Sequence, residues 1–479
     1  MKKYLLLAIT GLAISSLQAQ EVSDALRYAQ DNLNGTARFR GMSGAFGALG
    51  GDFSALNVNP AGGAVFTSSQ IAVTLSNRSL SNKSKYFGTG TKENDNSFDL
   101  NQLGAIWVFE NNDSSTGWKR FTIGANYDNV SNFDNTIYSQ GHNPNNSISN
   151  YFLSYANGNN FGDYSQQQTD LGFQGYLINL GTDGSGNTVY TRNTPTGGNY
   201  YQENYVNTSG YNGKLSFNFA AQYNDKFYFG LNLNSHFTDY TRKTSFYEDY
   251  LDTPGAPTNL QSSRFVNELY SYGNGFSFQV GAIAKVTSDL RAGFAYESPT
   301  WYRFTEDFRQ SIASNLGGLD TGTITYPDYR LQTPGKYTAS LAYVFGKIGL
   351  ISVDYAMKDY SNTKFRPNDD FFSSRNDQME SLLDATSEVR VGAEVRAKKW
   401  SFRGGYRFEQ SPYKDGKTVG DLNSVSGGLG YNFGPIKVDA AYAYAKRDSQ
   451  LQYFTQGFTD RANIKSVSNT VSLTLLFEM

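Results

Sequence analysis

The sequence contains no cysteine, only two histidines and 11 prolines among its 479 residues. The absence of cysteine excludes disulfide bonds, thiolate metal sites and thiol catalysis. Beyond the first 19 residues, no apolar run approaches the roughly 20 residues that a membrane helix needs. The formal net charge is only −2, and no run of basic residues is present, so the chain has no electrostatic footprint for binding nucleic acid.

The two histidines offer little chemistry. His142 and His236 are far apart in the sequence, and neither belongs to a Ser/His/Asp pattern or to a cluster of metal-ligand residues. Ordinary polar roles are expected for both. We therefore expect no catalytic residue, no metal site and no cofactor, and we do not expect an enzyme.

The sequence is instead rich in alternating segments. From about Ile71 to the last residue, apolar and polar residues alternate in about fourteen stretches, of which 216–223 and 227–234 are typical. Side chains of a strand point alternately to opposite faces, so each stretch predicts a strand with one apolar and one polar face. Further apolar rows begin at Phe276, Leu290, Tyr337, Val389, Phe402, Val438 and Val467.

The connections between these strands alternate between short and long. Short turns are expected near 110–118, 224–226, 287–289, 346–347, 397–399 and 432–436. Long connections are expected near 82–98, 130–208, 241–274, 299–336, 361–386, 410–423 and 446–465. Tight turns on one rim and long loops on the other are typical of an outer-membrane barrel, and the 35 Tyr and 34 Phe suit its aromatic girdles. The sequence thus predicts an all-β, membrane-spanning antiparallel barrel of about 14 strands, formed by residues 70–479.

The chain begins with the features of a secretory signal peptide, assigned to residues 1–19. Lys2 and Lys3 supply a positive start, residues 4–17 form an apolar core, and Ala19 is suited to precede the cleavage site. The core is too short to span a bilayer comfortably. We therefore expect export from the cytoplasm.

Residues 20–69 form a separate segment between the signal and the barrel. Its glycines recur at every third position from Gly41 to Gly50, a spacing that matches neither the dinucleotide nor the P-loop pattern. Small residues fit between inward-pointing side chains of a narrow lumen. A mere linker would be more polar and would not need Phe39, Phe46 and Phe53. We expect a hatch that plugs the lumen.

A motif in this segment resembles a known family. Gly51 and Asp52, followed by Asn59, Pro60, Ala61 and Gly62 before the first strand, resemble the FadL-type outer-membrane transporters of hydrophobic compounds, the OmpP1/FadL/TodX family. Similar matches continue at Thr333-Pro334, Tyr343-Val-Phe-Gly, Asp354-Tyr355, Gly392-Ala-Glu394 and Arg403-Gly-Gly-Tyr406. The resemblance covers essentially the whole mature chain.

The resemblance implies a function. It implies a monomeric barrel in the outer membrane of a Gram-negative-type bacterium, inserted by the barrel-assembly machinery and surrounded by lipid and lipopolysaccharide. It also implies passive uptake of hydrophobic small molecules such as long-chain fatty acids, with capture at the outer loops, a hatch-gated lumen and sideways release through a break in the wall. By analogy with the family, Gly124 and Asn126 are candidates for that break.

Two groups of residues are candidate ligand contacts. Arg390, Arg403 and Arg407 lie on the inward faces of adjacent predicted strands, where guanidinium groups suit a fatty-acid carboxylate. The alternative is a structural ladder of ion pairs that also pins the hatch, because charged residues are ordinary in barrel lumens.

The second group lies in the long connection at 130–208. Its apolar residues Leu171, Phe173, Tyr176 and Leu177 predict an extracellular apolar lip. The alternative, a disordered tip, suits 181–199 better than 150–180.

Two other functions remain open. A porin for polar solutes would need an open lumen, against which the glycine-rich segment argues. A haem-binding surface receptor has only the support of two histidines.

Overall fold

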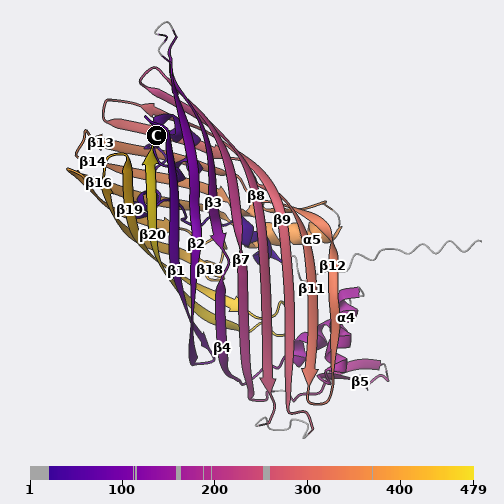
Figure 1. The fold of residues 1–479 in the computed structure, drawn as a ribbon. Helices are drawn as coiled ribbons and strands as arrows, with labels where there is room; N and C mark the ends of the chain where they lie inside the picture. The colour runs from indigo at the N-terminus through magenta and orange to yellow at the C-terminus, as the bar shows by residue number, and fades with distance from the viewer. Residues whose placement is uncertain are drawn as a thin grey trace, which may run out of the picture.

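The computed structural model describes residues 21–111, 113, 116–157, 163–186, 188–195, 197–251, 259–368 and 370–479. The predicted signal peptide at residues 1–19 lies outside them. In the described chain, 18 strands form one antiparallel sheet that closes into a barrel where β1 pairs with β20 (Figure 1). No helix of the described ranges is long and apolar enough to span a bilayer.

Several of these strands are successive parts of one crossing, so the wall contains 14 crossings, as predicted. In order around the barrel they are β1 (Gln70–Tyr86), β2 (Thr89–Glu110), β3 (Trp118–Asn132) with β4 (Asn135–Asn143), β7 (Tyr200–Tyr223), β8 (Phe227–Asp249), β9 (Ser262–Lys285), β10 (Leu290–Glu297) with β11 (Trp301–Ser314), β12 (Gly318–Gln332) with β13 (Lys336–Phe345), β14 (Gly349–Asp359), β16 (Ala385–Ala397), β17 (Trp400–Glu409), β18 (Val419–Asn432), β19 (Ile436–Gln452) and β20 (Arg461–Glu478).

The alternation within each strand separates lipid from lumen. On β7, Phe217 and Phe219 are exposed on the outer surface, whereas Asn218 between them is buried inside. The side-chain amide of Asn218 donates to Asn232 of the neighbouring strand at 2.7 Å, so polar side chains of the lumen wall pair across strands. The apolar rows predicted from the sequence therefore face outward.

The predicted short turns are present at the rim where the chain ends, but four predicted long loops are wrong. Residues 82–98, 241–274, 299–336 and 446–465 are largely strand: β1 and β2 are joined only by residues 87–88, and β8, β9, β11 and β12 extend far past the opposite rim (Figure 1). On these extensions the outward positions carry exposed charged side chains such as Arg303 and Asp328, whereas inward positions such as Phe304 and Phe308 are buried in apolar clusters. The outward apolar row is therefore missing while the backbone pairing continues. The outer side of the barrel is therefore a tall wall.

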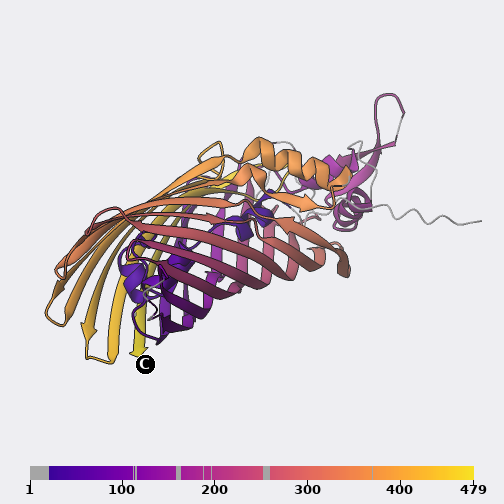
Figure 2. The ribbon, with the colours of Figure 1, turned by 90° about the horizontal axis from the view of Figure 1, so that it is seen from above.

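The N-terminal segment lies inside this wall (Figure 2). Residues 21–69, which we call the hatch, contain α1 (Val22–Ala29), α2 (Ala37–Gly41), η1 (Ser54–Asn57) and η2 (Pro60–Val65). Helix α1 begins where the Asp24 carboxylate accepts a hydrogen bond from the backbone N–H of Glu21 at 3.1 Å. Phe39, Met42 and Phe46 of the hatch form an apolar cluster with Ala342 and Leu350 of the wall.

The outer end carries a small cap and a further helix. The cap lies within residues 149–192 and contains α3 (Ser149–Ala156), α4 (Asp163–Gln174), β5 (Ile178–Thr182) and β6 (Thr188–Arg192). The connection after β14 contains η3 (Tyr360–Asn362), β15 (Lys364–Arg366) and α5 (Asp370–Leu382), and α5 packs over the hatch helix α1 (Figure 2).

Candidate functional site

The motif residues that suggested the family form a compact, hydrogen-bonded turn region within the hatch. Gly50 and Gly51 have φ near +64°, and the N–H of Gly51 donates to the carbonyl of Gly62 at 3.1 Å. The Asp52 carboxylate accepts bonds from the Thr36 hydroxyl and from the Ser54 N–H at 2.8 and 2.9 Å. Burial raises the pKa of Asp52 above its ordinary value, and the charge of Arg38 opposes that shift.

The second half of the motif ties the hatch to the wall. The amide of Asn59 donates to the carbonyls of Gly47 and of Ala282, the latter on β9, at 2.7 and 3.0 Å. Pro60 begins the short helix η2, which contains Ala61 and Gly62, and its carbonyl accepts from Asn218 at 2.9 Å. The motif residues therefore hold the hatch in place.

The predicted arginine cluster surrounds a glycine depression in the wall. Arg390 and Arg407 are register partners on β16 and β17, and the next inward pair is Gly392 opposite Gly405. A Cβ atom on Gly405 would lie 2.5 Å from the carbonyl carbon of Met42, so the missing side chains make room for the hatch backbone. The cluster is thus part of the surface on which the hatch rests.

Each arginine of this cluster is bound to carboxylates. Arg390 donates two bonds to Glu388 at 2.7 and 2.6 Å, and Arg407 bonds both Glu388 and Glu409. Arg403 pairs with Glu394 at 2.6 Å and with Asp439. Glu394 also forms an ion pair with Arg38 of the hatch, at 2.9 Å. These contacts favour the alternative interpretation, an ion-pair ladder that pins the hatch, over a free carboxylate site.

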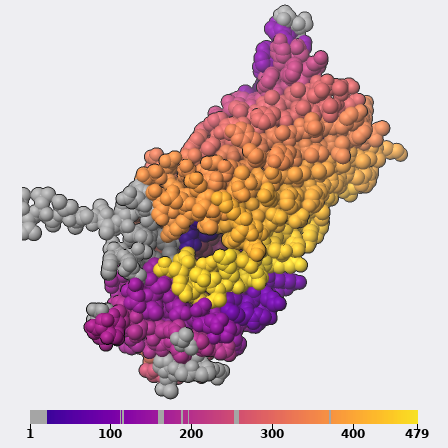
Figure 3. Space-filling view, turned by 180° about the vertical axis from the view of Figure 1, so that it is seen from behind, coloured from indigo at the N-terminus to yellow at the C-terminus, as the bar shows by residue number. Residues whose placement is uncertain are grey.

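A large cavity opens above the hatch at the outer end of the barrel, and we call it the outer cavity. Its volume is about 680 Å³, and helix α1 contributes its floor. Apolar atoms form most of its exposed lining, with Phe246, Phe308 and Phe454 among its residues, and charged side chains such as Arg242 and Arg375 also line it. In Figure 3 the indigo N-terminal segment is visible through a hollow between the orange and yellow parts of the wall. The outer cavity is therefore accessible from outside.

The predicted lip residues divide between two environments. Leu171 and Leu177 are fully buried in the apolar core of the cap, whereas Phe173 and Tyr176 are 40% and 46% exposed. This core includes Phe454, which also lines the outer cavity. The cap therefore stands beside the entrance, and only two of the four residues present an apolar surface to solvent.

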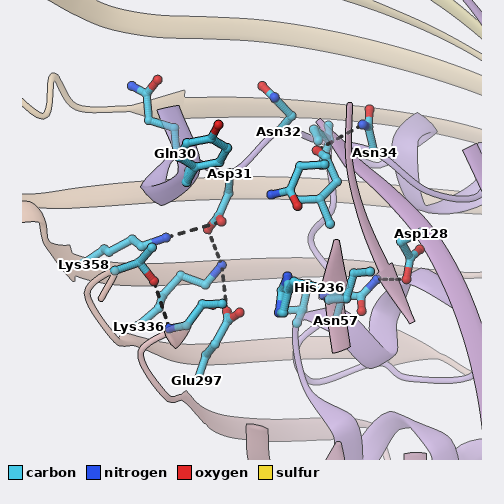
Figure 4. Close-up of a pocket in the computed structure, with 18 of the residues that line it drawn as sticks. Gln30, Asp31, Asn32, Asn34, Asn57, Asp128, His236, Glu297, Lys336 and Lys358 are labelled. Carbon is cyan, nitrogen blue, oxygen red and sulfur yellow. Dashed lines mark hydrogen bonds and ion pairs between the residues drawn. The ribbon is translucent and has the colours of Figure 1, made fainter. Parts of the chain in front are cut away.

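Below α1 lies a polar chamber between the hatch and the wall (Figure 4). Asp31 of the hatch bonds Lys336 of β13 at 2.7 Å and Lys358 of β14 at 3.3 Å. Although burial opposes it, these two ammonium groups hold the pKa of Asp31 well below its usual range. Asn57 donates to Asp128 across the chamber at 2.8 Å. The chamber is lined by polar groups that fix hatch residues 30–34.

The barrel wall contains a break in its backbone pairing. Strands β2 and β3 pair from Glu110 opposite Arg120 to Gln102 opposite Asp128, and no pairing between β2 and β3 or β4 follows in the described residues beyond that point. Side chains bridge the separation instead: Asn132 donates to Asp99 at 2.9 Å, and the Thr136 hydroxyl donates to Asp95 at 2.8 Å.

The break is not at the predicted positions. Gly124 and Asn126 are still paired with Ile106 and Gly104, so the expectation that they mark the break is wrong by a few residues. Next to the true break lies a third cavity of about 230 Å³, the side cavity, whose wall includes Asp99, Asn101 and Asn132. Two of its four arginines, Arg40 and Arg78, were not predicted as site residues: Arg40 lies in the hatch, two residues after Arg38, and Arg78 is on the first strand.

Within the described residues, both histidines have ordinary polar or packing contacts. His236 is buried in the wall, and its two ring nitrogens lie 2.9 Å from the Ser277 hydroxyl and 3.3 Å from the Tyr302 hydroxyl. His142 packs against the ring of Tyr201. Across the residues that can be placed, no group of three or more His, Asp or Glu is arranged to hold a metal ion.

Comparisons with solved structures show the fold. A crystal structure of a Pseudomonas aeruginosa FadL homologue superposes with a TM-score of 0.58 at 14% identity, covering 94% of this chain and 99% of that one. The P. putida toluene transporter TodX gives 0.55 at 14% identity, with coverage of 94% and 99%. The Ralstonia pickettii toluene transporter TbuX gives 0.52 at 16% identity, with coverage of 93% and 100%. No curated protein sequence matches this chain.

A family model decides the wider relationship. The model described as outer membrane protein transport protein (OMPP1/FadL/TodX) matches residues 178–475, which is more than half of the chain. That match includes the wall glycines and the ion-pair ladder around them, and it is independent of the motif in the hatch. With the closed 14-strand barrel, it shows that this chain belongs to the OmpP1/FadL/TodX family of outer-membrane transport proteins.

Proposed function

We propose that this protein is a passive outer-membrane channel for hydrophobic small molecules such as long-chain fatty acids. It is exported by its signal peptide, inserted by the barrel-assembly machinery, and works as a monomer among lipid and lipopolysaccharide. Ligand is captured in the outer cavity, passes the hatch and leaves sideways into the membrane. The observation that carries the proposal is an apolar cavity, open to the outside, directly above a plugged lumen.

Capture follows from the lining of the outer cavity. A ligand that leaves water for this wall gains about 0.8 kcal/mol per buried methylene group. Arg27 of the hatch lies 3.6 Å from the ring centroid of Tyr240, so the floor combines an aromatic surface with a cation. This suits an apolar chain better than a hydrated polar solute.

Passage requires only a local change in the hatch. Helix α1 separates the outer cavity from the polar chamber, and residues 32–34 line both the polar chamber and the side cavity. A shift of residues 21–34 would join the three cavities while the rest of the hatch stays bound to the wall. The driving force is the ligand gradient, and no energy source is needed.

Release is proposed at the break between β2 and the β3–β4 crossing. Backbone pairing seals most of the wall, and side chains can separate at far lower cost than a paired ladder. An apolar chain leaving here enters the lipid directly and avoids the polar rim of the barrel.

The first test identifies the ligand. Purified protein would be examined by native mass spectrometry and by conductance in planar bilayers, beside a variant lacking residues 20–62. A retained apolar molecule, with low conductance that rises when the hatch is removed, supports the proposal. An empty protein that conducts ions with its hatch in place would indicate a porin.

The second test blocks the proposed exit. Because the chain has no cysteine, the double variant Asp95→Cys with Thr136→Cys places the only two thiols across the break, where the native side chains touch. Cross-linking these thiols should stop ligand delivery to lipid vesicles without reducing ligand binding, and reduction should restore delivery. Unchanged delivery in the cross-linked protein would rule out this exit.

A further inference from the structure

The side cavity has an excess of positive charge. Among its described lining residues are four arginines and one lysine but a single carboxylate, that of Asp99. The charges of Arg407 and Arg447 are paired, because both residues form ion pairs with Glu409, at 2.6 and 3.1 Å. Arg40 of the hatch and Arg78 of β1 are different, since neither forms an ion pair with any carboxylate in the described part of the chain.

Arg40 is a buried cation with unused hydrogen-bonding capacity. It is 3% exposed, and its one close bond goes to the neutral Asn34 side chain at 2.7 Å. Its Nε is buried and has no hydrogen-bond acceptor in the described residues. Burial, together with the nearby charge of Arg78, lowers the pKa of Arg40 to about 10, although the Asp99 carboxylate opposes this shift. A guanidinium in such a place favours an anionic partner.

Arg78 faces the same cavity from the barrel wall. Its two terminal nitrogens donate to the backbone carbonyls of Asn132 and Asp134, each at 3.0 Å. These carbonyls belong to the chain just beyond the break, where β3 has left β2. Arg78 thus replaces lost backbone pairing with side-chain hydrogen bonds.

The rest of the cavity leaves room for an apolar chain. The lumen-facing positions of β19 and β20 beside it are small, with Ala443 and Ala445 on one strand and Ser466 and Ser468 on the other. Leu33 of the hatch and Leu80 of β1 add apolar surface. The cavity therefore combines two guanidinium groups that form no ion pair in the described residues with a partly apolar wall.

Building on the proposed function, we propose that the side cavity is a headgroup site for an anionic amphiphile, whose carboxylate lies between Arg40 and Arg78. Guanidinium groups bind carboxylates through paired, charge-assisted hydrogen bonds, which a neutral hydrocarbon cannot form. The preferred substrates are then apolar chains that end in a carboxylate.

Binding at this site also acts on the exit. A carboxylate competes for the donors of Arg78, so it draws them from the carbonyls of Asn132 and Asp134. The segment after the break then loses two of its bonds to β1. The ligand that occupies the site thereby loosens the wall through which it leaves.

The test compares two ligands of equal chain length, a long-chain carboxylate and the corresponding alcohol, by calorimetric titration of the full-length mature protein. The wild type should bind the carboxylate at least about tenfold more tightly. Arg40→Gln and Arg78→Gln should each weaken carboxylate binding about 10- to 100-fold and leave alcohol binding unchanged. Arg78→Lys should retain part of the preference because it keeps the charge.

Arg291→Gln is the matched control. Arg291 is also a lumen arginine with a buried, unpartnered Nε and a bond to a hatch carbonyl, that of Leu49 at 3.2 Å, but it lies outside the side cavity. This variant should bind both ligands as the wild type does. Equal binding of carboxylate and alcohol by the wild type, or equal losses in all three glutamine variants, would overturn the headgroup site. Failure of the wild type to bind either ligand would instead refute the proposed function.

Discussion

The close fit of the hatch against the glycine pair on β16 and β17 leads to a quantitative prediction. In Gly405→Ala, the new Cβ would lie 2.5 Å from the carbonyl carbon of Met42 and 2.7 Å from the backbone nitrogen of Ser43. Ordinary carbon contacts lie at about 3.5 to 4.0 Å, so the hatch backbone must move by about 1 Å. Both clashing atoms are main-chain atoms, which cannot rotate away as a side chain can.

The expected cost follows from this overlap. Inserting a methyl group into a packed interior costs about 1–3 kcal/mol when the structure cannot adapt. If the cost falls on the seated hatch, its equilibrium with a displaced state shifts by about 5- to 150-fold. Single-channel recording in planar bilayers should then show more frequent openings, and limited proteolysis should cut the hatch sooner.

The control is another lumen-facing glycine. In Gly124→Ala on β3, the nearest atom to the new Cβ is 3.5 Å away, which is an ordinary contact. This variant should behave as the wild type in both assays. If Gly405→Ala opens no more often than Gly124→Ala, and its hatch resists protease equally, the hatch does not depend on this depression and the reasoning is refuted.

Three further predictions concern the hatch and the cap. Asp354→Ala removes the acceptor of the backbone N–H groups of Phe46 and Gly47, at 2.9 and 3.1 Å, and should destabilise the seated hatch by about 1–3 kcal/mol, seen as faster proteolysis. Because its lysine partners lower the pKa of Asp31, that carboxylate stabilises the hatch above the ordinary Asp pKa of about 3.9. This stabilisation is lost as the pH falls through the lower folded value, so hydrogen exchange of residues 28–34 should rise only below about pH 4. Phe152→Ala empties a fully buried site and should cost the cap about 3–5 kcal/mol, measured as proteolysis within residues 149–192.

Each of these has a matched comparison. Asp354→Asn keeps an acceptor oxygen and should be milder than Asp354→Ala; equal effects would contradict the hydrogen-bond argument. Asp31→Asn should abolish the acid-dependent rise, and a rise that persists in this variant would assign it to another group. Phe173→Ala removes an exposed ring of the same cap and should leave its rate of proteolysis unchanged. Proteolysis as fast as in Phe152→Ala would show that burial of Phe152 does not explain the stability of the cap.

The parts of the fold that the sequence predicts are those governed by lipid. Phe217 and Phe219 must face hydrocarbon, so their alternation with polar residues is strict, and the short turns between such strands follow from it. Above the lipid this constraint ends. Residues 82–98 are mostly polar apart from Tyr86, Phe87 and Phe98, so no apolar row marks them. The backbone pairing between β1 and β2 shows that most of them are strand.

The site was harder to predict because it depends on pairing between distant segments. Arg390 and Arg407 suggest a free cationic cluster until Glu388, two residues before Arg390 on the same face, is included. That signal is present in the sequence, because residues i and i+2 of a strand share a face. By contrast, the meeting of Arg40 with Arg78 depends on where the hatch lies inside the barrel, which no local pattern encodes.

The distribution of contacts within the hatch indicates which part of it yields to a ligand. Residues 42–65 are held by close packing and buried hydrogen bonds: wall glycines against the Met42 main chain, the Asp354 carboxylate on two backbone N–H groups, and the Asn59 side-chain amide between hatch and β9. Moving them would break many buried bonds at once, and each bond to a charged group alone contributes about 1.5–3 kcal/mol. Residues 30–34 have no regular structure and are fixed mainly by side chains, chiefly Asp31 to two lysines. An entering carboxylate can exchange for Asp31 on those lysines, since it offers the same chemistry. We therefore infer that the ligand displaces residues 30–34, together with helix α1 before them, and leaves residues 42–65 in place.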